Sequence, residues 1–94
     1  MINNVTLIGR LTATPELRQT TTGKTVASFC IAVERRFDRA TSDFINIVAW
    51  NKTAEFVGKY FTKGDLIALN GSIQTRKYED KDGNKRTAFE VLAD

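Results

Sequence analysis

The sequence predicts one small domain that is mostly β-structure with a single short helix. Several stretches alternate apolar and polar residues with the two-residue period of a β-strand. One stretch, residues 53–61, changes to a helical period that places Ala54, Val57 and Phe61 on one stripe. The chain of 94 residues is long enough for one modest core and too short for two, so residues 1–94 are expected to form a single domain.

The strand expected over residues 44–50 is the most informative part of the chain. Its β-branched and aromatic residues favour extended structure, and alternation separates its two faces. One face, made by Ile45, Ile47 and Ala49, is uniformly apolar and suits a core. The other face carries Phe44 and Trp50, and two outward aromatic rings form a candidate stacking platform for bases. The alternative is that either ring packs under a loop or in a subunit interface.

Two further strands are expected before this one. Residues 4–11 alternate and predict a first strand, with Gly9 as a bulge or bend. Residues 14–18 turn the chain at Pro15, and residues 19–24 form a second turn. A long strand over residues 25–37 follows, and its far end, from Arg35 to Phe37, is expected to project into solvent. Residues 39–43 then form a short connection.

The expected helix is followed by two more strands. Asn51 or Thr53 is suited to cap its start, and Gly64 suits its end. Residues 66–78 predict a fourth strand, and an Asp82-Gly83 turn leads to a fifth over residues 87–92. Five strands with one helix between the third and fourth is the order of an OB-fold, a small Greek-key barrel that commonly binds oligonucleotides.

Composition narrows the possible functions. The chain lacks histidine, a glycine-rich phosphate loop and a convincing carboxylate pair, so we expect neither an enzyme nor a bound metal or cofactor. The lone Cys30 is expected to be a small core residue. No apolar run approaches a membrane span and the N-terminus lacks signal-peptide order, which predicts a cytoplasmic protein. A net charge of +3 and a pI near 9.2 permit a polyanionic partner.

A series of short motifs runs along essentially the whole chain: Asn4–Leu11, Thr14–Arg18, Val26–Val33, Phe44–Trp50 followed by Lys52, Ala54 and Glu55, Lys63-Gly64, Gly71–Tyr78 and Glu90-Val91. No single motif is specific, but their order and spacing together are. In these motifs the chain closely resembles the DNA-binding domain of the bacterial single-stranded DNA-binding (SSB) proteins.

The resemblance implies that single-stranded DNA lies over the strand faces. The family's stacking positions correspond to Phe37, Phe44, Trp50 and Tyr78. The matching or neighbouring cations, expected at phosphates, are Arg10, Arg35, Arg36, Lys52, Arg76 and Lys77. For each cation the alternative is a solvated surface charge. Many relatives have Trp at the positions of Phe37 and Tyr78. Phe and Tyr still present an aromatic ring face there.

The resemblance also implies a role and an assembly. The expected role is to coat single-stranded DNA with little sequence preference in replication, repair and recombination, in association with the nucleoid. The expected assembly is a homotetramer, a dimer of dimers, built in part on an exposed strand edge such as residues 4–8. Replication and repair proteins are expected partners only if an acidic C-terminal tail is present. The alternative function is a primosome accessory protein of the same fold that acts mainly through protein contacts.

Overall fold

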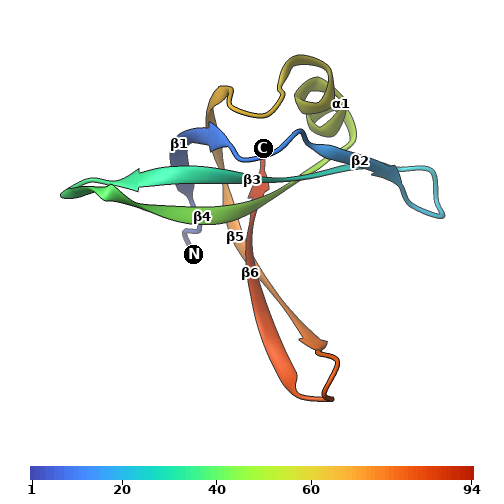
Figure 1. The fold of residues 1–94 in the computed structure, drawn as a ribbon. Helices are drawn as coiled ribbons and strands as arrows, with labels where there is room; N and C mark the ends of the chain where they lie inside the picture. Colours follow the sequence, from blue (N-terminus) through green and yellow to red (C-terminus); the bar gives the residue numbers. More distant parts are fainter.

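The computed structural model describes residues 1–94 as six strands and one helix (Figure 1). The order is β1 (Val5–Leu11), β2 (Glu16–Gln19), β3 (Thr25–Arg35), β4 (Asp38–Trp50), α1 (Asn51–Tyr60), β5 (Leu66–Glu79) and β6 (Lys85–Ala93). The helix therefore lies between the strands predicted as third and fourth. The structure confirms an all-β fold with one helix.

The strand pairings run in a ring. From β1 they pass through β5, β6, β4 and β3, and β3 then pairs with β1 again. Two links in the ring are short. β4 and β6 pair in parallel at two positions, including Ile47 with Val91, and β1 pairs with β3 only at Arg10 and Leu11. These links bring strands that are distant in sequence around one core, as the predicted barrel requires.

The core lies inside this ring and is small. Ile31 of β3 and Ile47 of β4 are its largest fully buried side chains, and Val57 closes it from the helix. The remaining buried members of this cluster are Leu11, Phe29, Ile67 and Val91. The predicted apolar face of β4 is confirmed, since Ile47 and Ala49 are buried and Ile45 packs against the core.

The structure corrects the predicted number of strands. Residues 16–19, expected within turns, form β2 and pair with residues 25–28 of β3. All four β2 residues are exposed, so no apolar alternation marked them as a strand. Leu17 contacts α1 at Gly58, where a Cβ would have no room. β2 is therefore held by its backbone pairing and by this one side-chain contact.

The start and end of α1 also differ from the prediction. Neither Asn51 nor Thr53 caps the helix: Trp50 is the N-cap residue and forms no side-chain cap hydrogen bond. Asn51 instead takes a left-handed φ of 54°, which Asn tolerates better than most residues, so β4 enters the helix without a loop. Gly64 lies beyond the helix end, and its N–H donates to the Leu11 carbonyl at 2.8 Å.

Gly9 forms no bulge, which was one of the two alternatives predicted for it. It pairs with Ile67 in an unbroken β1–β5 register, so no bulge forms there. A Cβ at Gly9 would lie 2.6 Å from the carbonyl oxygen of Ala32. The glycine allows the close approach of β1 and β3 that completes the ring of pairings.

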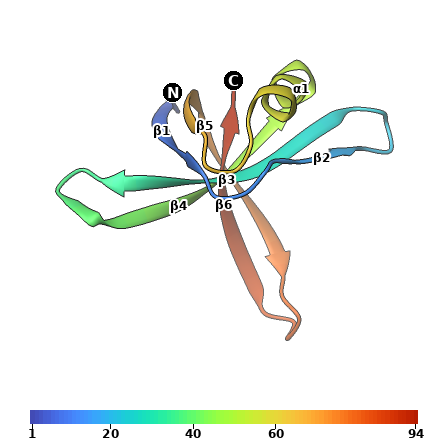
Figure 2. The same cartoon turned by 45° about the horizontal axis from the view of Figure 1, so that its top comes forward.

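Three hairpins extend outward from the barrel (Figure 2). They are formed by β2–β3, β3–β4 and β5–β6. The expected connection at residues 39–43 belongs to β4, because Ser42 pairs with Glu34 and Asp38 with Arg35. The β3–β4 hairpin therefore turns at Arg36 and Phe37, which confirms that this end of the long strand projects into solvent.

We call residues 74–90, the outer part of the β5–β6 hairpin, the arm. Its ladder is regular from Gly71–Ala93 to Glu79–Lys85. At its tip the Asp80 carboxylate accepts hydrogen bonds from the backbone N–H groups of Asp82 and Asn84, at 3.0 and 2.9 Å, and from Nε of Arg86 at 2.9 Å. The Arg86 contact, followed by the Asn84 N–H, lowers the pKa of Asp80. One carboxylate thus organises the whole turn.

This arrangement predicts an acid-dependent arm tip. The pKa of Asp80 is lower in the folded chain than in the unfolded chain. The stability that its carboxylate contributes is therefore complete above the usual Asp pKa of about 3.9, and it is lost as the pH falls from there through the lower, folded-state pKa. The amide-proton chemical shifts of Asp82 and Asn84 should follow this titration by NMR. The Asp80→Asn variant should abolish it. The same titration in the variant, or none in the wild-type chain, would contradict the assignment.

Candidate nucleic-acid interface

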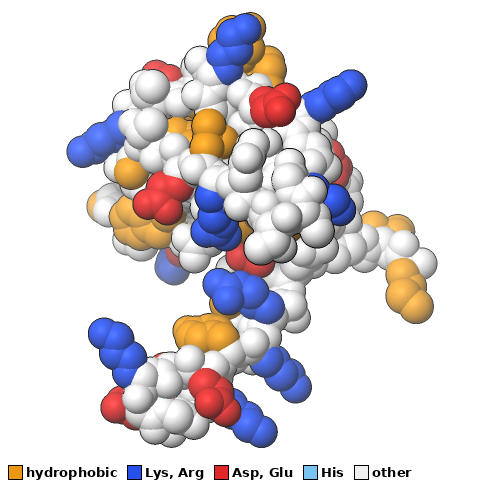
Figure 3. Space-filling model, turned by 90° about the vertical axis from the view of Figure 1, so that its right-hand side faces the viewer, with side chains coloured by type: hydrophobic (Ala, Val, Ile, Leu, Met, Phe, Trp, Pro, Cys, Tyr) orange, Lys and Arg blue, Asp and Glu red, His pale blue; other side chains and the backbone are white.

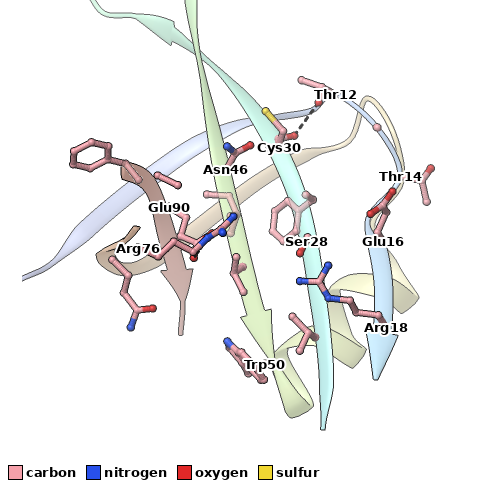
Figure 4. Close-up of a pocket in the computed structure, with 18 of the residues that line it drawn as sticks. Thr12, Thr14, Glu16, Arg18, Ser28, Cys30, Asn46, Trp50, Arg76 and Glu90 are labelled. Carbon is pink, nitrogen blue, oxygen red and sulfur yellow. Dashed lines mark hydrogen bonds and ion pairs between the residues drawn. The ribbon is translucent and has the colours of Figure 1, made fainter. Parts of the chain in front are cut away.

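A groove of about 720 Å³ crosses the outward face of β3 and β4 (Figure 4). The antiparallel register supplies its floor, since it places Ser28 opposite Val48 and Cys30 opposite Asn46. Residues 12–14 and β2 line one side, and residues of β5 and β6 line the other. The groove therefore crosses the width of the sheet, as a site for an extended polymer would.

Two of the predicted site residues, Trp50 and Arg76, line this groove. Trp50 ends β4 opposite Val26, with 40% of its surface exposed. Arg76 reaches the groove from β5, and Figure 4 shows it on the side away from Arg18. Together they place one aromatic ring and one cation on the same surface.

The other three predicted aromatic residues lie outside the groove lining. Phe44 shares the outward face of β4, opposite Ala32, and is 69% exposed. Phe37, at the tip of the β3–β4 hairpin, is 93% exposed. Tyr78 is exposed on the arm. Within this chain none of these rings packs under a loop, so each keeps a face available for stacking.

Two of the predicted cations are held against predicted aromatic rings. The guanidinium carbon of Arg36 lies 5.4 Å from the centroid of the Phe37 ring, and that of Arg76 lies 5.7 Å from the Tyr78 ring. Arg76 also forms an ion pair with Glu90, at 3.6 Å between Nε and Oε1. Each pair places a positive charge beside a ring, the combination that single-stranded nucleic acids require.

The remaining predicted cations are arranged differently. Arg35 donates from Nε and Nη2 to the Asp43 carboxylate at 3.1–3.3 Å, and this hydrogen bonding, with the attraction of the two charges, raises the pKa of Arg35. Arg10 donates from Nη1 to the Gly64 carbonyl at 3.1 Å. Lys52 on α1 and Lys77 on the arm are exposed. Of these four side chains, Arg35 forms the most hydrogen bonds within the chain.

Positive charge gathers on the arm. Residues 76–86 contain five Lys and Arg and three Asp and Glu. Figure 3 shows the blue side chains along the lower lobe that the arm forms, with a hydrophobic patch among them. Residues 76–86 therefore carry a net charge of +2, which Glu90 reduces to +1 for the whole arm, and Arg76 is the one arm cation that lines the groove.

The groove also contains residues that are not among the predicted site residues. Glu16 and Arg18 come from β2, where the sequence predicts a turn, and Phe89 and Glu90 come from β6. Phe89 is 68% exposed, and an aromatic residue next to a charged one in a short strand was the available signal. Cys30 is a correction: it is half-buried on the groove floor, because its parity in β3 is that of Ser28 and not that of Ile31.

Two other observations bear on the kind of site. No group of three or more His, Cys, Asp or Glu side chains is placed to hold a metal ion. The one helix is too short and too polar to cross a bilayer.

Comparison with known proteins agrees with this geometry. The model of the single-strand binding protein family matches residues 2–94. Single-stranded DNA-binding protein 1 of Staphylococcus aureus strain Mu50 is 49% identical over 98 aligned positions, covering 100% of this chain and 63% of the relative. The single-stranded DNA-binding protein of Clostridium tetani is 50% identical, covering 99% of this chain and 67% of the relative.

A third relative, single-stranded DNA-binding protein 1 of Lactococcus lactis, is 49% identical and is covered to 65% of its length. The chain thus spans about two thirds of the length of the curated relatives it matches. The family has the OB-fold, in agreement with the strand order seen here. Its members are binding proteins rather than enzymes. On the match to residues 2–94 and on identities near 50%, this chain belongs to the single-strand binding protein family.

Proposed function

We propose that this chain binds and coats single-stranded DNA with little sequence preference. The observation that carries the proposal is the groove across β3 and β4, which is lined by Trp50 and by the two arginines Arg18 and Arg76. Stacking suits any sequence because every base has a π-face, and cations bind the phosphates that all nucleotides share. The names of the relatives support this choice and do not favour the accessory-protein alternative.

The stacking surface extends beyond the groove in this proposal. Trp50 stacks a base within it, and Phe44 continues the surface along β4. Phe37 and Tyr78 stack bases on the two projecting hairpins, each with an arginine beside its ring. A strand of DNA would therefore run from the β3–β4 hairpin across the sheet to the arm.

Phosphates are bound by the cations along this path. Arg76 and the newly identified Arg18 line the groove, and Arg36 accompanies Phe37. The other cations proposed at phosphates are Arg10, Lys52 and Lys77. Arg35 is expected to contribute least, because Asp43 already occupies its donors.

The cellular role follows from the proposed binding. Coated DNA is kept unpaired and protected during replication, repair and recombination, which places the protein in the cytoplasm at the nucleoid. Replication and repair proteins would be partners only if the full-length protein has an acidic C-terminal tail.

We also propose assembly into a homotetramer. Residues 5–9 of β1 pair with β5 on one side, whereas β3 pairs with β1 only at residues 10 and 11, so one edge of β1 is free. The outward face of the same two strands exposes Ile8 and Leu66, at 58% and 57%. A free edge could join two chains in a dimer, and an apolar face could join two dimers.

The decisive test of the binding proposal uses the fluorescence of the lone tryptophan, Trp50. Its fluorescence should be quenched when oligo-dT binds, because the ring then contacts a base. Stacking contributes about 1–3 kcal/mol per base in single-stranded DNA-binding proteins, this family included. Trp50→Ala should therefore weaken binding about 5-fold to 150-fold, and Trp50→Phe should weaken it less. Tyr60→Ala, an exposed aromatic on α1, is the matched control. A destabilised Trp50→Ala chain with wild-type affinity would remove Trp50 from the interface.

Salt dependence tests the phosphate contacts. Affinity for a short oligonucleotide should fall as salt rises, with a slope of about −0.7 per phosphate neutralised on a single strand. Arg76→Ala should make the slope shallower by about that amount. Arg35→Ala should leave it nearly unchanged, because Asp43 engages Arg35. Equal effects of the two variants, measured by fluorescence titration at several salt concentrations, would contradict this division of roles.

The assembly proposal predicts a species of about four times the 10.5 kDa chain mass in sedimentation at micromolar concentration. Ile8→Lys should shift the chain to smaller species, since a charge buried without a partner is costly. Thr22→Lys, in the exposed β2–β3 turn, should leave the assembly intact. A wild-type chain that sediments only at 10.5 kDa would refute the proposal.

A further inference from the structure

One end of the groove is lined by polar side chains that neither stacking nor phosphate binding uses. Asn46, Gln74 and Glu90 come from the neighbouring strands β4, β5 and β6. Gln74 lies directly opposite Glu90 in the β5–β6 ladder, so their side chains share one face. Figure 4 shows Glu90 on the same side of the groove as Arg76. This end of the groove therefore offers hydrogen-bonding groups from three strands.

Glu90 is unusual among the charged residues that line the groove. Its side chain is 21% exposed, against 63% for its partner Arg76, and Glu16 and Arg18 are exposed. The 3.6 Å separation from Arg76 exceeds the roughly 2.7–2.9 Å of a charge-assisted hydrogen bond. The Glu90 carboxylate thus keeps acceptor capacity in a place where water competes less than at the open surface.

A carboxylate in this position is unfavourable for phosphate binding alone. It repels the backbone of every DNA sequence and competes with phosphates for Arg76. The Glu90 carboxylate would favour binding if it accepted hydrogen bonds from a base. An ionised carboxylate only accepts hydrogen bonds, so it selects bases by the donors that they present.

Guanine fits this requirement best. Its Watson–Crick edge presents two adjacent donors, N1–H and the N2 amino group, which can bind both oxygens of one carboxylate. Adenine, cytosine and thymine each present one donor group on that edge. Guanine O6 is an acceptor beside these donors, so a cation next to the carboxylate, as Arg76 is, could donate to it.

We propose that Glu90 reads the base edge in the groove and gives this one subsite a preference for guanine. The inference rests on the proposed binding of single-stranded DNA and deepens it. Stacking elsewhere on the surface remains indifferent to sequence, so the preference is local to the nucleotide that lies between Trp50 and the arm.

The test compares two oligomers that differ in one amino group. An oligo-dT of about ten nucleotides, within the range of one OB-fold, carries either one guanine or one hypoxanthine, which lacks the N2 amino group, at its centre. The wild-type chain should bind the guanine oligomer about 5-fold tighter, the low end for a bidentate contact. Affinities are measured by Trp50 quenching and by anisotropy of a labelled strand.

Three variants separate base reading from electrostatics. Glu90→Gln retains size but has one acceptor, so the ratio of the two affinities should fall to about one. Glu90→Asp retains the charge but draws the carboxylate back by one methylene, so the ratio should fall as well; it also decides the question if Glu90→Gln does not fold. Glu16→Gln removes a carboxylate from the other side of the groove and should leave the ratio unchanged.

The outcomes are distinguishable. If Glu90→Gln tightens both oligomers equally and keeps their ratio, Glu90 acts only as a repulsive charge and the inference is overturned. A wild-type ratio of one also overturns it and leaves the binding proposal intact. Failure to bind any oligomer would overturn the binding proposal and this inference together.

Discussion

The long antiparallel pairing of β3 with β4 is the constraint on which the rest of the structure depends. It runs without interruption from Val26–Trp50 to Glu34–Ser42. Because side chains alternate, the register that buries Ile31 and Ile47 is the same register that turns Asn46 and Trp50 outward. A slip of one residue would exchange the two faces. Packing of the core and construction of the groove are therefore a single requirement, and neither can change without the other.

The small core explains why the outer hairpins depend on polar contacts. Only 14 of 94 residues are buried, and all of the arm lies beyond them. Its tip is ordered by Asp80 through two backbone amides and Arg86. The β3–β4 hairpin is held in a similar way by the contact of Arg35 with Asp43 and by the Thr41 hydroxyl, which donates to Asp38 at 2.8 Å. The two outer hairpins proposed to bind DNA are thus ordered by exposed charges, whereas the groove between them is positioned by the core.

Alternation made much of this fold predictable from the sequence. The two faces of residues 44–50 and the outward Arg76 and Tyr78 follow from parity alone. β2 could not be predicted in this way, because a strand with four exposed residues has no apolar period. The start of β4 at Asp38 was missed for the same reason. Asn51 is a common capping residue, yet the direct entry of β4 into α1 requires it in the left-handed region, which is a tertiary constraint.

The site was predictable in its residue types but not in its pairings. Trp50 and Arg76 were expected from their outward parity, and both line the groove. That Glu90 lies within reach of Arg76 depends on the β5–β6 register, which places Arg76 opposite Ala88 and Glu90 opposite Gln74. Cys30 shows the same limit, since an apolar neighbourhood in sequence did not reveal on which side of β3 it lies.

In the proposed complex, the Arg–aromatic pairs on the two hairpins would limit the entropic cost of binding DNA. Arg36 rests over Phe37 and Arg76 over Tyr78, so each cation is already restrained beside the ring that would stack a base. A base and its own phosphate are joined covalently, and a ring and a cation at a fixed separation can engage both at once. Less side-chain freedom then remains to be lost when DNA binds. With a net charge of only +3, the proposed binding would depend less on the amount of positive charge than on where the hairpins hold it.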